Sequence, residues 1–159
     1  MKTFLLHLVL IFAIQSVVFS QISRKEAMQD LGFLVGEWVG TSRTFEGDSV
    51  LTKVPAFEKI SYKVDQHILT IDLHSETLQL HTVIYFDEKD QTYYYNPFYK
   101  GGAGKYPAQL KDGKLIVSPS DEKRFIFQRT KDGKFKEYGE KLENGKWIKY
   151  FEDIFIEAS

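Results

Sequence analysis

The chain has no cysteine among its 159 residues. Disulfide bonds and a cysteine-linked lipid anchor are therefore excluded. A folded domain of this chain must be stabilised by its hydrophobic core alone. The length is sufficient for that, because a domain of about 150 residues buries roughly two-thirds of the surface of its unfolded chain.

An excess of charge of one sign is also lacking. The chain carries 21 lysines and arginines against 22 aspartates and glutamates, and the two signs are interleaved along the sequence. A nucleic-acid-binding protein is expected to show a basic patch. Because no such patch interspersed with aromatic residues stands out, we do not expect a nucleic acid as a partner.

The familiar catalytic motifs are missing as well. The sequence contains no Gly-x-Ser-x-Gly, no His-Glu-x-x-His and no phosphate-binding glycine loop. Histidine is scarce, and none of the 78 residues after His81 is a histidine. The sequence therefore predicts no catalytic residue. It leaves open whether the protein is an enzyme and favours binding over catalysis.

What the chain does have is an apolar segment at its start. Lys2 gives this segment a basic beginning, and residues 4–19 are apolar except for one histidine, one glutamine and one serine. The pattern predicts a signal peptide over 1–20 that is cleaved before Gln21. An exported protein, periplasmic or secreted, would then have no membrane anchor. An uncleaved anchor is disfavoured, because a membrane-spanning helix needs about 20 uninterrupted apolar residues.

A short helical segment is predicted over 21–36. Ser23 is followed three residues later by Glu26, which is the spacing of a capping box at the start of a helix. The apolar residues near helical spacing are Met28, Leu31 and Leu34. These signals predict a helix over Ser23–Leu34.

The rest of the domain, 37–157, is predicted to consist of β-strands. Nine breaks with turn residues divide it into about ten strands, and Asp-Gly and Asn-Gly are the strongest hairpin signals among them. The breaks lie at Glu46–Asp48, Asp65–Gln66, Ser75–Thr77, Glu88–Asp90, Gly101–Gly104, Asp112–Gly113, Ser118–Ser120, Asp132–Gly133 and Asn144–Gly145. No crossover helix is indicated, and a closed meander has no free edges. We therefore predict an all-β fold, a single ten-stranded antiparallel up-and-down barrel behind a short N-terminal helix.

The first hairpins allow the register to be predicted. A two-residue turn at Asp65–Gln66 pairs Val64 with His67. The cross-strand pairs that follow are Tyr62 with Leu69, Ile60 with Ile71, Leu73 with Leu80, Ile71 with Thr82, Leu69 with Ile84, Ile84 with Tyr95, and Phe86 with Tyr93. One face then stays apolar from strand to strand, which is the consistency expected of a correct register. Tyr93 and Tyr95 would face the lumen.

The register of the last strands depends on the lengths of two turns. If Asn144–Gly145 is a two-residue turn, the more apolar face carries Phe135, Glu137, Ile148, Tyr150 and Ile154, and we expect it to point inward. The opposite face carries Lys136, Trp147, Lys149, Phe151 and Asp153. A three-residue loop over 131–133 would place Phe125, Phe127 and Arg129 inside. A two-residue turn would place them outside, and both alternatives stay open.

The stretch Leu31–Gly40 reads Leu-Gly-Phe-Leu-Val-Gly-Glu-Trp-Val-Gly. It resembles the opening of the calycin-like barrels, which include lipocalins, nitrobindin-type haem barrels and uncharacterised families that begin with Leu-x-x-Leu-x-Gly-x-Trp-x-Gly. The resemblance implies that Trp38 plugs one end of the barrel and that the interior holds a small apolar ligand or haem. Nitrobindin-type barrels ligate haem iron through a late histidine. This chain has none after His81, so no cofactor is expected.

Three groups of polar residues have more than one interpretation. Asp72, His74 and His81 share a face, but that face carries lysines, so a solvated pair is preferred to a metal site. Inward-facing Glu58 and Glu137 would support acid–base chemistry if burial raised their pKa values. A pair with Arg129, or a wet end of the lumen, is the preferred interpretation.

The run from Tyr93 to Gly104 combines aromatic residues, a proline and three glycines. It is interpreted either as a portal that faces a ligand or as a strand end followed by a flexible turn.

The apolar inner face with its tyrosines predicts an exported protein that binds a small apolar or amphipathic molecule. The predicted ligand contacts are Trp38, Tyr62, Tyr93, Tyr95, Arg129 and Tyr150. Arg129 would anchor an acidic head group. One alternative is a closed-core barrel that binds proteins through an outer patch of Tyr94, Trp147, Phe151 and Phe155. Another is a haem-binding barrel with a non-standard axial ligand.

Overall fold

The computed structural model describes residues 21–158. The predicted signal peptide over 1–20 lies outside the described residues. Within them, no helix has the length and apolar character needed to cross a membrane.

The helical segment begins as predicted. Helix α1 spans Arg24–Gln29, and a 3-10 helix, η1, spans Gly32–Leu34. The Ser23 hydroxyl accepts a hydrogen bond from the Glu26 backbone N–H, and the Glu26 carboxylate accepts one from the Ser23 N–H. The capping box is therefore confirmed. The predicted helix is nevertheless interrupted before Gly32, a residue with low helix propensity.

Eleven strands follow within the described residues. They are β1 (Gly36–Glu46), β2 (Ser49–Lys63), β3 (Ile68–Ser75), β4 (Gln79–Asp87), β5 (Thr92–Tyr99), β6 (Gly102–Ala103), β7 (Tyr106–Lys111), β8 (Lys114–Ser120), β9 (Lys123–Arg129), β10 (Phe135–Glu143) and β11 (Lys146–Glu157). The β8–β9 turn falls after Ser120, so the break that the sequence predicts at Ser118–Ser120 is two residues too early.

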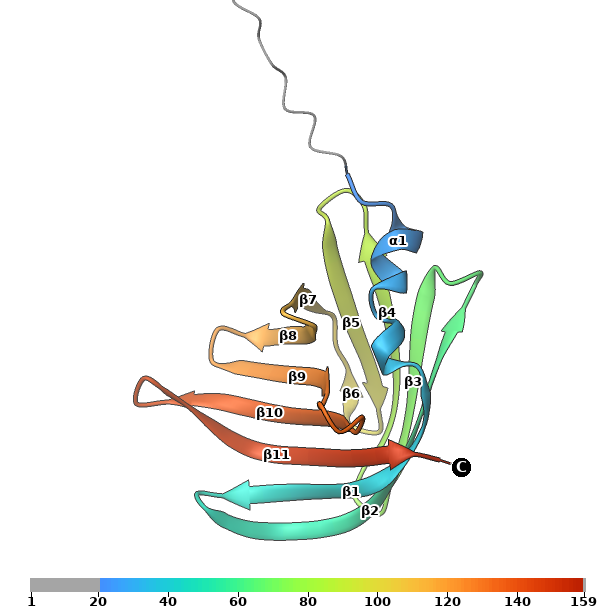
Figure 1. Cartoon of the computed structure of the whole chain (residues 1–159). Coiled ribbons are helices and arrows are strands. Elements are labelled where there is room, and N and C mark those ends of the chain that lie inside the picture. Colours follow the sequence, from blue (N-terminus) through green and yellow to red (C-terminus); the bar gives the residue numbers. More distant parts are fainter. Residues whose placement is uncertain (1–20, 159) are drawn as a thin grey trace, which may run out of the picture.

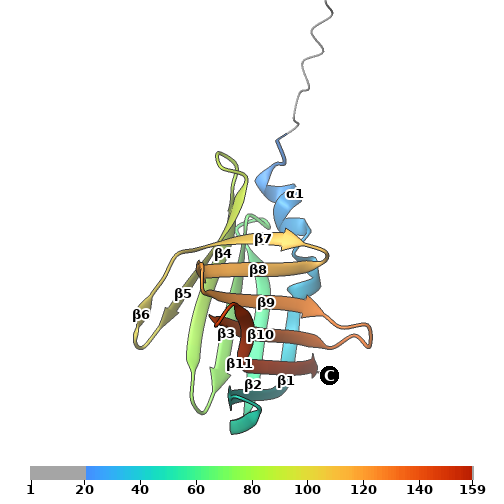
Figure 2. The same ribbon diagram turned by 90° about the vertical axis from the view of Figure 1, so that its left-hand side faces the viewer.

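The strands form one closed antiparallel barrel, as predicted. The hydrogen-bonded order is β4-β3-β2-β1-β11-β10-β9-β8-β7-β5, and β4 pairs with β5 to close the ring of ten strands. The two-residue strand β6 pairs only with the end of β5. Figure 1 shows α1 beside β3, β4 and β5 at one end of the barrel, and Figure 2 shows β7, β8 and β9 stacked in sequence order.

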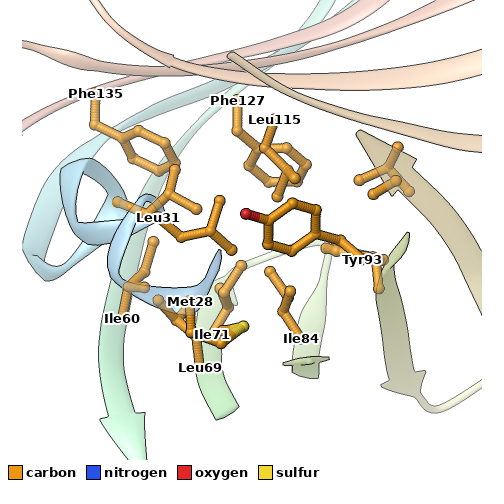
Figure 3. Packing of buried hydrophobic residues seen from close by; sticks show 14 of the residues in the cluster. Met28, Leu31, Ile60, Leu69, Ile71, Ile84, Tyr93, Leu115, Phe127 and Phe135 are labelled. Atoms are coloured by element: carbon orange, nitrogen blue, oxygen red, sulfur yellow. The ribbon is translucent and has the colours of Figure 1, made fainter. Parts of the chain in front are cut away.

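We call the end covered by α1 and η1 the closed end. The end with the turns at 75–78 and 99–104 is called the open end. The closed end is filled by the hydrophobic core, in which Met28 and Leu31 pack among residues of the barrel wall (Figure 3). The surrounding core residues include Ile60, Leu69, Ile71, Ile84, Tyr93, Leu115, Phe127 and Phe135.

The predicted register of β2 to β5 is confirmed from the pair Tyr62–Leu69 to the pair Phe86–Tyr93. Val64 and His67 lie in the turn between β2 and β3, where the His67 N–H donates to the Val64 carbonyl. Ile60 lies opposite Ile71, Leu73 opposite Leu80, and Ile84 opposite Tyr95. The remaining predicted pairs, Tyr62–Leu69, Ile71–Thr82, Leu69–Ile84 and Phe86–Tyr93, are also present.

The register of β10 and β11 corrects the prediction for the last strands. Pairing shifts between Gly139 and Glu140, so that Tyr150 is an extra residue in β11. Such a bulge reverses which side chains point inward beyond it. Phe151 and Asp153 therefore face inward although they were predicted outside, and Ile154 lies on the outer face opposite Lys136.

Two further points of the late register follow. Phe155 is fully buried and stacks on Phe135, so it cannot belong to an outer patch. The loop over 131–133 has three residues between Thr130 and Lys134, which hydrogen-bond to each other. The three-residue loop is therefore the correct alternative of the two that the sequence left open. Arg129 pairs with inward-facing Phe135, so Phe125, Phe127 and Arg129 lie on the inner face.

Candidate functional site

A cavity of about 310 Å³ lies in the open end of the barrel. Its lining comprises Leu78, Leu80, Tyr95, Pro97, Tyr99, Tyr106, Phe125, Glu137, Tyr150 and Phe151. These residues come from the β3–β4 turn and from β4, β5, β7, β9, β10 and β11. The lining is mostly aromatic or aliphatic, and Glu137 is its single charged residue.

Aromatic side chains form one continuous wall of this cavity. The Tyr95 ring lies 6.3 Å from the Phe125 ring, and Phe125 lies 6.0 Å from Phe151. Phe151 in turn meets Tyr150 edge-on at 5.2 Å. Beneath this wall, the Tyr95 ring contacts buried Phe127 at 5.7 Å. Edge-to-face and tilted contacts at these distances are favourable and hold the rings in place.

The bulge in β11 is what brings two of these rings together. Regular alternation would send Tyr150 and Phe151 to opposite faces of the strand, but the extra residue lets both side chains reach the lumen. Gly139 on β10 makes room for them, because a Cβ at this position would overlap the Phe151 ring and approach Tyr150 at 2.8 Å. The cavity therefore depends on a glycine at position 139, where any larger residue would displace the two rings.

Three acidic side chains gather behind the cavity. Glu137 on β10 lies directly opposite Asp153 on β11, and Glu58 reaches them from β2. Glu58 is 1% exposed and Glu137 is 7% exposed. The carboxyls of Glu58 and Glu137 are hydrogen-bonding neighbours, and Oδ1 of Asp153 is buried without a hydrogen-bond partner. Within residues 21–158, none of the three forms an ion pair with a basic side chain.

Burial changes the protonation of this acidic cluster. It raises the pKa of Glu58 to about 8, with a further contribution from the charge of Asp153. Burial and the charge of Glu58 raise the pKa of Glu137 well above its usual value. Burial also raises the pKa of Asp153 to about 6, against the effect of a hydrogen bond from Ser42. Near neutral pH the cluster therefore keeps protons that exposed carboxyls would have lost.

The two tyrosines of the aromatic wall are affected by the same cluster. Burial raises the pKa of Tyr150 to about 12, and the charge of Glu137 adds to this effect. The pKa of Tyr95 is raised well above its usual value, first by burial and then by Glu137. Glu137 thus lies close enough to act electrostatically on both rings. Both hydroxyls remain protonated at neutral pH.

The other predicted ligand contacts lie at the closed end, outside the lining of this cavity. Tyr62 and Tyr93 donate hydrogen bonds from their hydroxyls to the carbonyls of Met28 and Ala27, at 2.8 and 2.7 Å. They hold α1 against the barrel. The predicted set is therefore divided: the structure brings Tyr95 and Tyr150 together at the cavity and places Tyr62, Tyr93, Trp38 and Arg129 away from it.

Trp38 and Arg129 form a separate contact at the closed end. Trp38 is completely buried, and its indole N–H donates to the Leu34 carbonyl at 2.9 Å. The Arg129 guanidinium lies 4.3 Å above the Trp38 ring and donates to the carbonyls of Phe33 and Gly133. Its acidic neighbour is Glu157, at 4.0 Å. The preferred pairing of Arg129 with an inward carboxylate is therefore wrong.

Sequence reasoning missed several residues of the cavity. Phe151 was placed outside because the bulge was not recognised, and Leu78, Leu80 and Tyr106 were not singled out. The run from Tyr93 to Gly104 was a useful signal, since Tyr95, Pro97 and Tyr99 all line the cavity.

A second and larger depression, of about 830 Å³, lies at the β3–β4 hairpin and the end of β5. It includes Asp72, His74 and His81, and His81 Nδ1 lies 2.6 Å from Asp72 Oδ1. Both side chains of this pair are nearly half exposed. Among residues 21–158 there is no group of three or more histidines, cysteines or acidic residues arranged to hold a metal ion.

The cavity does not fit the haem that the resemblance to nitrobindin-type barrels implies. Its lining contains no histidine, and tyrosine is the remaining side chain there that is known to ligate haem iron. A phenolate is the ligating form. The raised pKa values of Tyr95 and Tyr150 favour the neutral phenol instead.

Comparisons with known proteins bear on the fold. The sequence matches no family model and no curated protein. Among solved structures, Rv2717c from Mycobacterium tuberculosis is similar with a TM-score of 0.59 and 9% identity, covering 86% of this chain and 100% of that chain. A protein of unknown function from the DUF3598 family of Nostoc punctiforme covers the same shares with 7% identity and a TM-score of 0.29, too low to carry an argument. The likeness to Rv2717c extends to the fold alone.

Proposed function

We propose that this protein binds a small, largely apolar or amphipathic molecule in the cavity at the open end of its barrel. The observation that carries the proposal is the cavity itself, about 310 Å³ in volume and walled by the rings of Tyr95, Phe125, Tyr150 and Phe151. Small-molecule sites are concave, mostly apolar and carry a few polar groups, and their volumes begin at about 300 Å³. A compact ligand would fill this one.

The difference between the two ends of the barrel supports this proposal. Packing closes the end beneath α1, where Leu31, Leu69 and Phe127 are fully buried. At the other end Leu78 and Tyr99 line the cavity while remaining 43% and 45% exposed. Exposed apolar side chains at the rim of a cavity are typical of a ligand entrance. We further propose that the mature chain begins at Gln21 and acts outside the cytoplasm.

Native mass spectrometry of the chain from Gln21, purified from its own host without denaturation, tests the proposal. We expect a stoichiometric extra mass that is lost on denaturation. The neutral fluorescent probe N-phenyl-1-naphthylamine provides an independent assay, with increased emission on binding in the cavity.

Two substitutions and one control make the assay specific. Tyr95→Ala and Tyr150→Ala together remove half of the aromatic wall, and we expect both the extra mass and the probe signal to fall sharply. Tyr94→Ala is the matched control, because Tyr94 is on the same strand as Tyr95 with its hydroxyl bound to Asp90 on the outside. Unchanged uptake in the folded double variant would count heavily against the proposal.

The alternative of a protein-interaction module receives less support. Two of its four patch residues, Phe151 and Phe155, face inward. Trp147 lies under the guanidinium of Arg124 at 4.1 Å and so is partly covered.

A further inference from the structure

We propose that the ligand of this cavity is an organic amine, whose ammonium group binds Glu137 and whose apolar body packs against the aromatic wall. The inference rests on the proposed function and names the chemical class of its ligand. It starts from an imbalance of charge. Three acidic side chains face the interior of the barrel, and among residues 21–158 no basic side chain forms an ion pair with any of them.

The geometry of the acidic cluster is that of an incomplete site. Glu137 alone reaches the cavity, and Asp153 and Glu58 lie behind it. The carboxyls of Glu58 and Glu137 are hydrogen-bonding neighbours, whereas Oδ1 of Asp153 is buried without a hydrogen-bond partner. Thr82, an inward neighbour on β4, has a fully buried hydroxyl next to that of Tyr95. Buried polar groups are nearly always paired, and an exception requires an explanation such as an absent ligand.

The basic residues nearest in sequence or in the predicted site, Lys136 and Arg129, do not serve as cationic partners of the acidic cluster. Arg129 is held at the closed end by the Phe33 and Gly133 carbonyls. Lys136, which neighbours Glu137 in sequence, points to the outer face and pairs with Glu152 at 2.7 Å. In the part of the chain that the structure describes, the charge of Glu137 is left without a cationic partner, and a ligand would supply one.

The aromatic wall favours a cation for a second reason. Aromatic rings carry a negative face, and ligand ammonium groups bind to such faces in cages of tyrosine, tryptophan and phenylalanine. Here Tyr95, Tyr150 and Phe151 stand around the cavity that Glu137 enters. An anionic ligand would find no basic side chain in the lining to bind it. A neutral ligand would leave the acidic cluster unpaired.

Proton release on binding distinguishes an amine from a neutral ligand that binds by packing alone. The groups that face Glu137 are Glu58 from β2, Asp153 and Tyr150 from β11, and Tyr95 from β5. All are acids, and the raised pKa values of Glu58 and Glu137 let these two carboxyls hold protons near neutral pH. A bound ammonium group stabilises their charged forms, so protons leave the cluster when the amine binds.

Three probes of nearly equal size separate charge from shape: 2-phenylethylamine, 2-phenylethanol and phenylacetate. Isothermal titration calorimetry at pH 7 should show that the amine binds about tenfold or more tightly than the alcohol. Phenylacetate should bind more weakly than the alcohol. Titrations in two buffers of different ionisation enthalpy should show proton release with the amine and none with the alcohol.

Glu137→Gln is the decisive variant. It should reduce the preference for the amine over the alcohol to about twofold or less, while binding of the alcohol is retained. Glu143→Gln, an exposed acid on the same strand, is the matched control and should leave the preference intact. If Glu137→Gln does not fold, Glu58→Gln serves instead and should reduce proton release without blocking the cavity.

The outcomes distinguish this inference from the proposed function. If the alcohol or phenylacetate binds as tightly as the amine, the cavity is a binding site but the amine class is wrong. If none of the probes binds and native mass spectrometry shows no extra mass, the proposed function fails as well.

Discussion

Glu137 and Asp153 are direct cross-strand neighbours on the inner face of β10 and β11, and burial raises the pKa of both carboxyls. Like charges placed opposite each other across a sheet destabilise it. The pair persists here because protons retained by the cluster reduce that repulsion. The same pair lies at the base of the cavity, so one structural feature links the stability of the barrel to the chemistry of its site.

The first prediction concerns the dependence of stability on pH. The carboxyls of Glu58, Glu137 and Asp153 have raised pKa values, so the folded protein binds more protons than the unfolded chain between about pH 4 and pH 8. The free energy of unfolding should therefore fall as the pH rises through this window. Urea unfolding at pH 5, 7 and 9 measures it.

Glu58→Gln should flatten this profile. Its neutral amide has nothing to ionise, so at pH 8 the variant should be more stable than the parent by roughly 1 to 3 kcal/mol. Exposed Glu143→Gln should leave the profile unchanged. A parent protein whose stability is constant or rises from pH 5 to pH 9 would show that the cluster is hydrated and ordinary.

The second prediction concerns the outer face of the same strands. Glu152 is 5% exposed and pairs with Arg43, Lys136 and Lys149. Burial alone would raise the pKa of its carboxyl, but hydrogen bonds from Lys136 and Lys149 outweigh this effect and lower it to about 2. Glu152→Gln should cost about 1 to 3 kcal/mol at pH 7, since its basic partners are themselves partly solvated.

The pH window of this second effect is different. A lowered pKa contributes stability above the unfolded value near 4.5, and this contribution is lost as the pH falls towards 2. The parent and Glu152→Gln should therefore converge at low pH in urea unfolding experiments. Glu37→Gln breaks an exposed pair with Lys59 and serves as the control, with little expected change. Equal losses in both variants would contradict the role of burial.

The third prediction concerns the glycine opposite the bulge. Gly139→Ala introduces a Cβ that overlaps the Phe151 ring, so Phe151 and Tyr150 must move. We expect a loss of about 1 to 3 kcal/mol in unfolding free energy, as for other overpacked sites, together with weaker uptake of the fluorescent probe.

Gly113→Ala is the comparison for Gly139→Ala. Its added Cβ meets no atom within 4 Å, and its φ of 69° makes the cost one of backbone conformation. Stability should fall modestly, and uptake of the probe should not change. If Gly139→Ala leaves both stability and uptake at the level of the parent, the bulge does not shape the cavity.

The fourth prediction separates stability from binding at Arg129. Arg129→Met removes the hydrogen bonds to the Phe33 and Gly133 carbonyls and the contact with the Trp38 ring. Thermal unfolding should show a loss of about 1 to 3 kcal/mol. Binding of the neutral probe should be retained, because Arg129 does not line the cavity. Loss of binding in a folded variant would instead support the acidic-ligand anchor that the sequence predicted.

The predictions from sequence succeeded where local rules decide the structure. From Ile60 to Tyr95, short turns set the register and alternation set the inner face, so each pair could be inferred from its neighbour. They failed at Asp153 because a bulge changes the alternation at one residue. The bulge lies where Gly139 pairs with Phe151, and these two residues are twelve positions apart in the chain.

By itself, the sequence determined the all-β class, the capped N-terminal helix and the inward positions of Glu58 and Glu137, because turn residues, caps and alternation act over a few neighbouring positions. Only the tertiary structure decided that Asp153 also faces inward, next to these two glutamates. It likewise decided that Arg129 packs on Trp38 and does not pair with the glutamates. It also divided the predicted ligand contacts between a filled end and a hollow one. The physical reason is that ring closure, bulges and cavities depend on which side chains meet across the barrel, and those contacts join residues far apart in the chain.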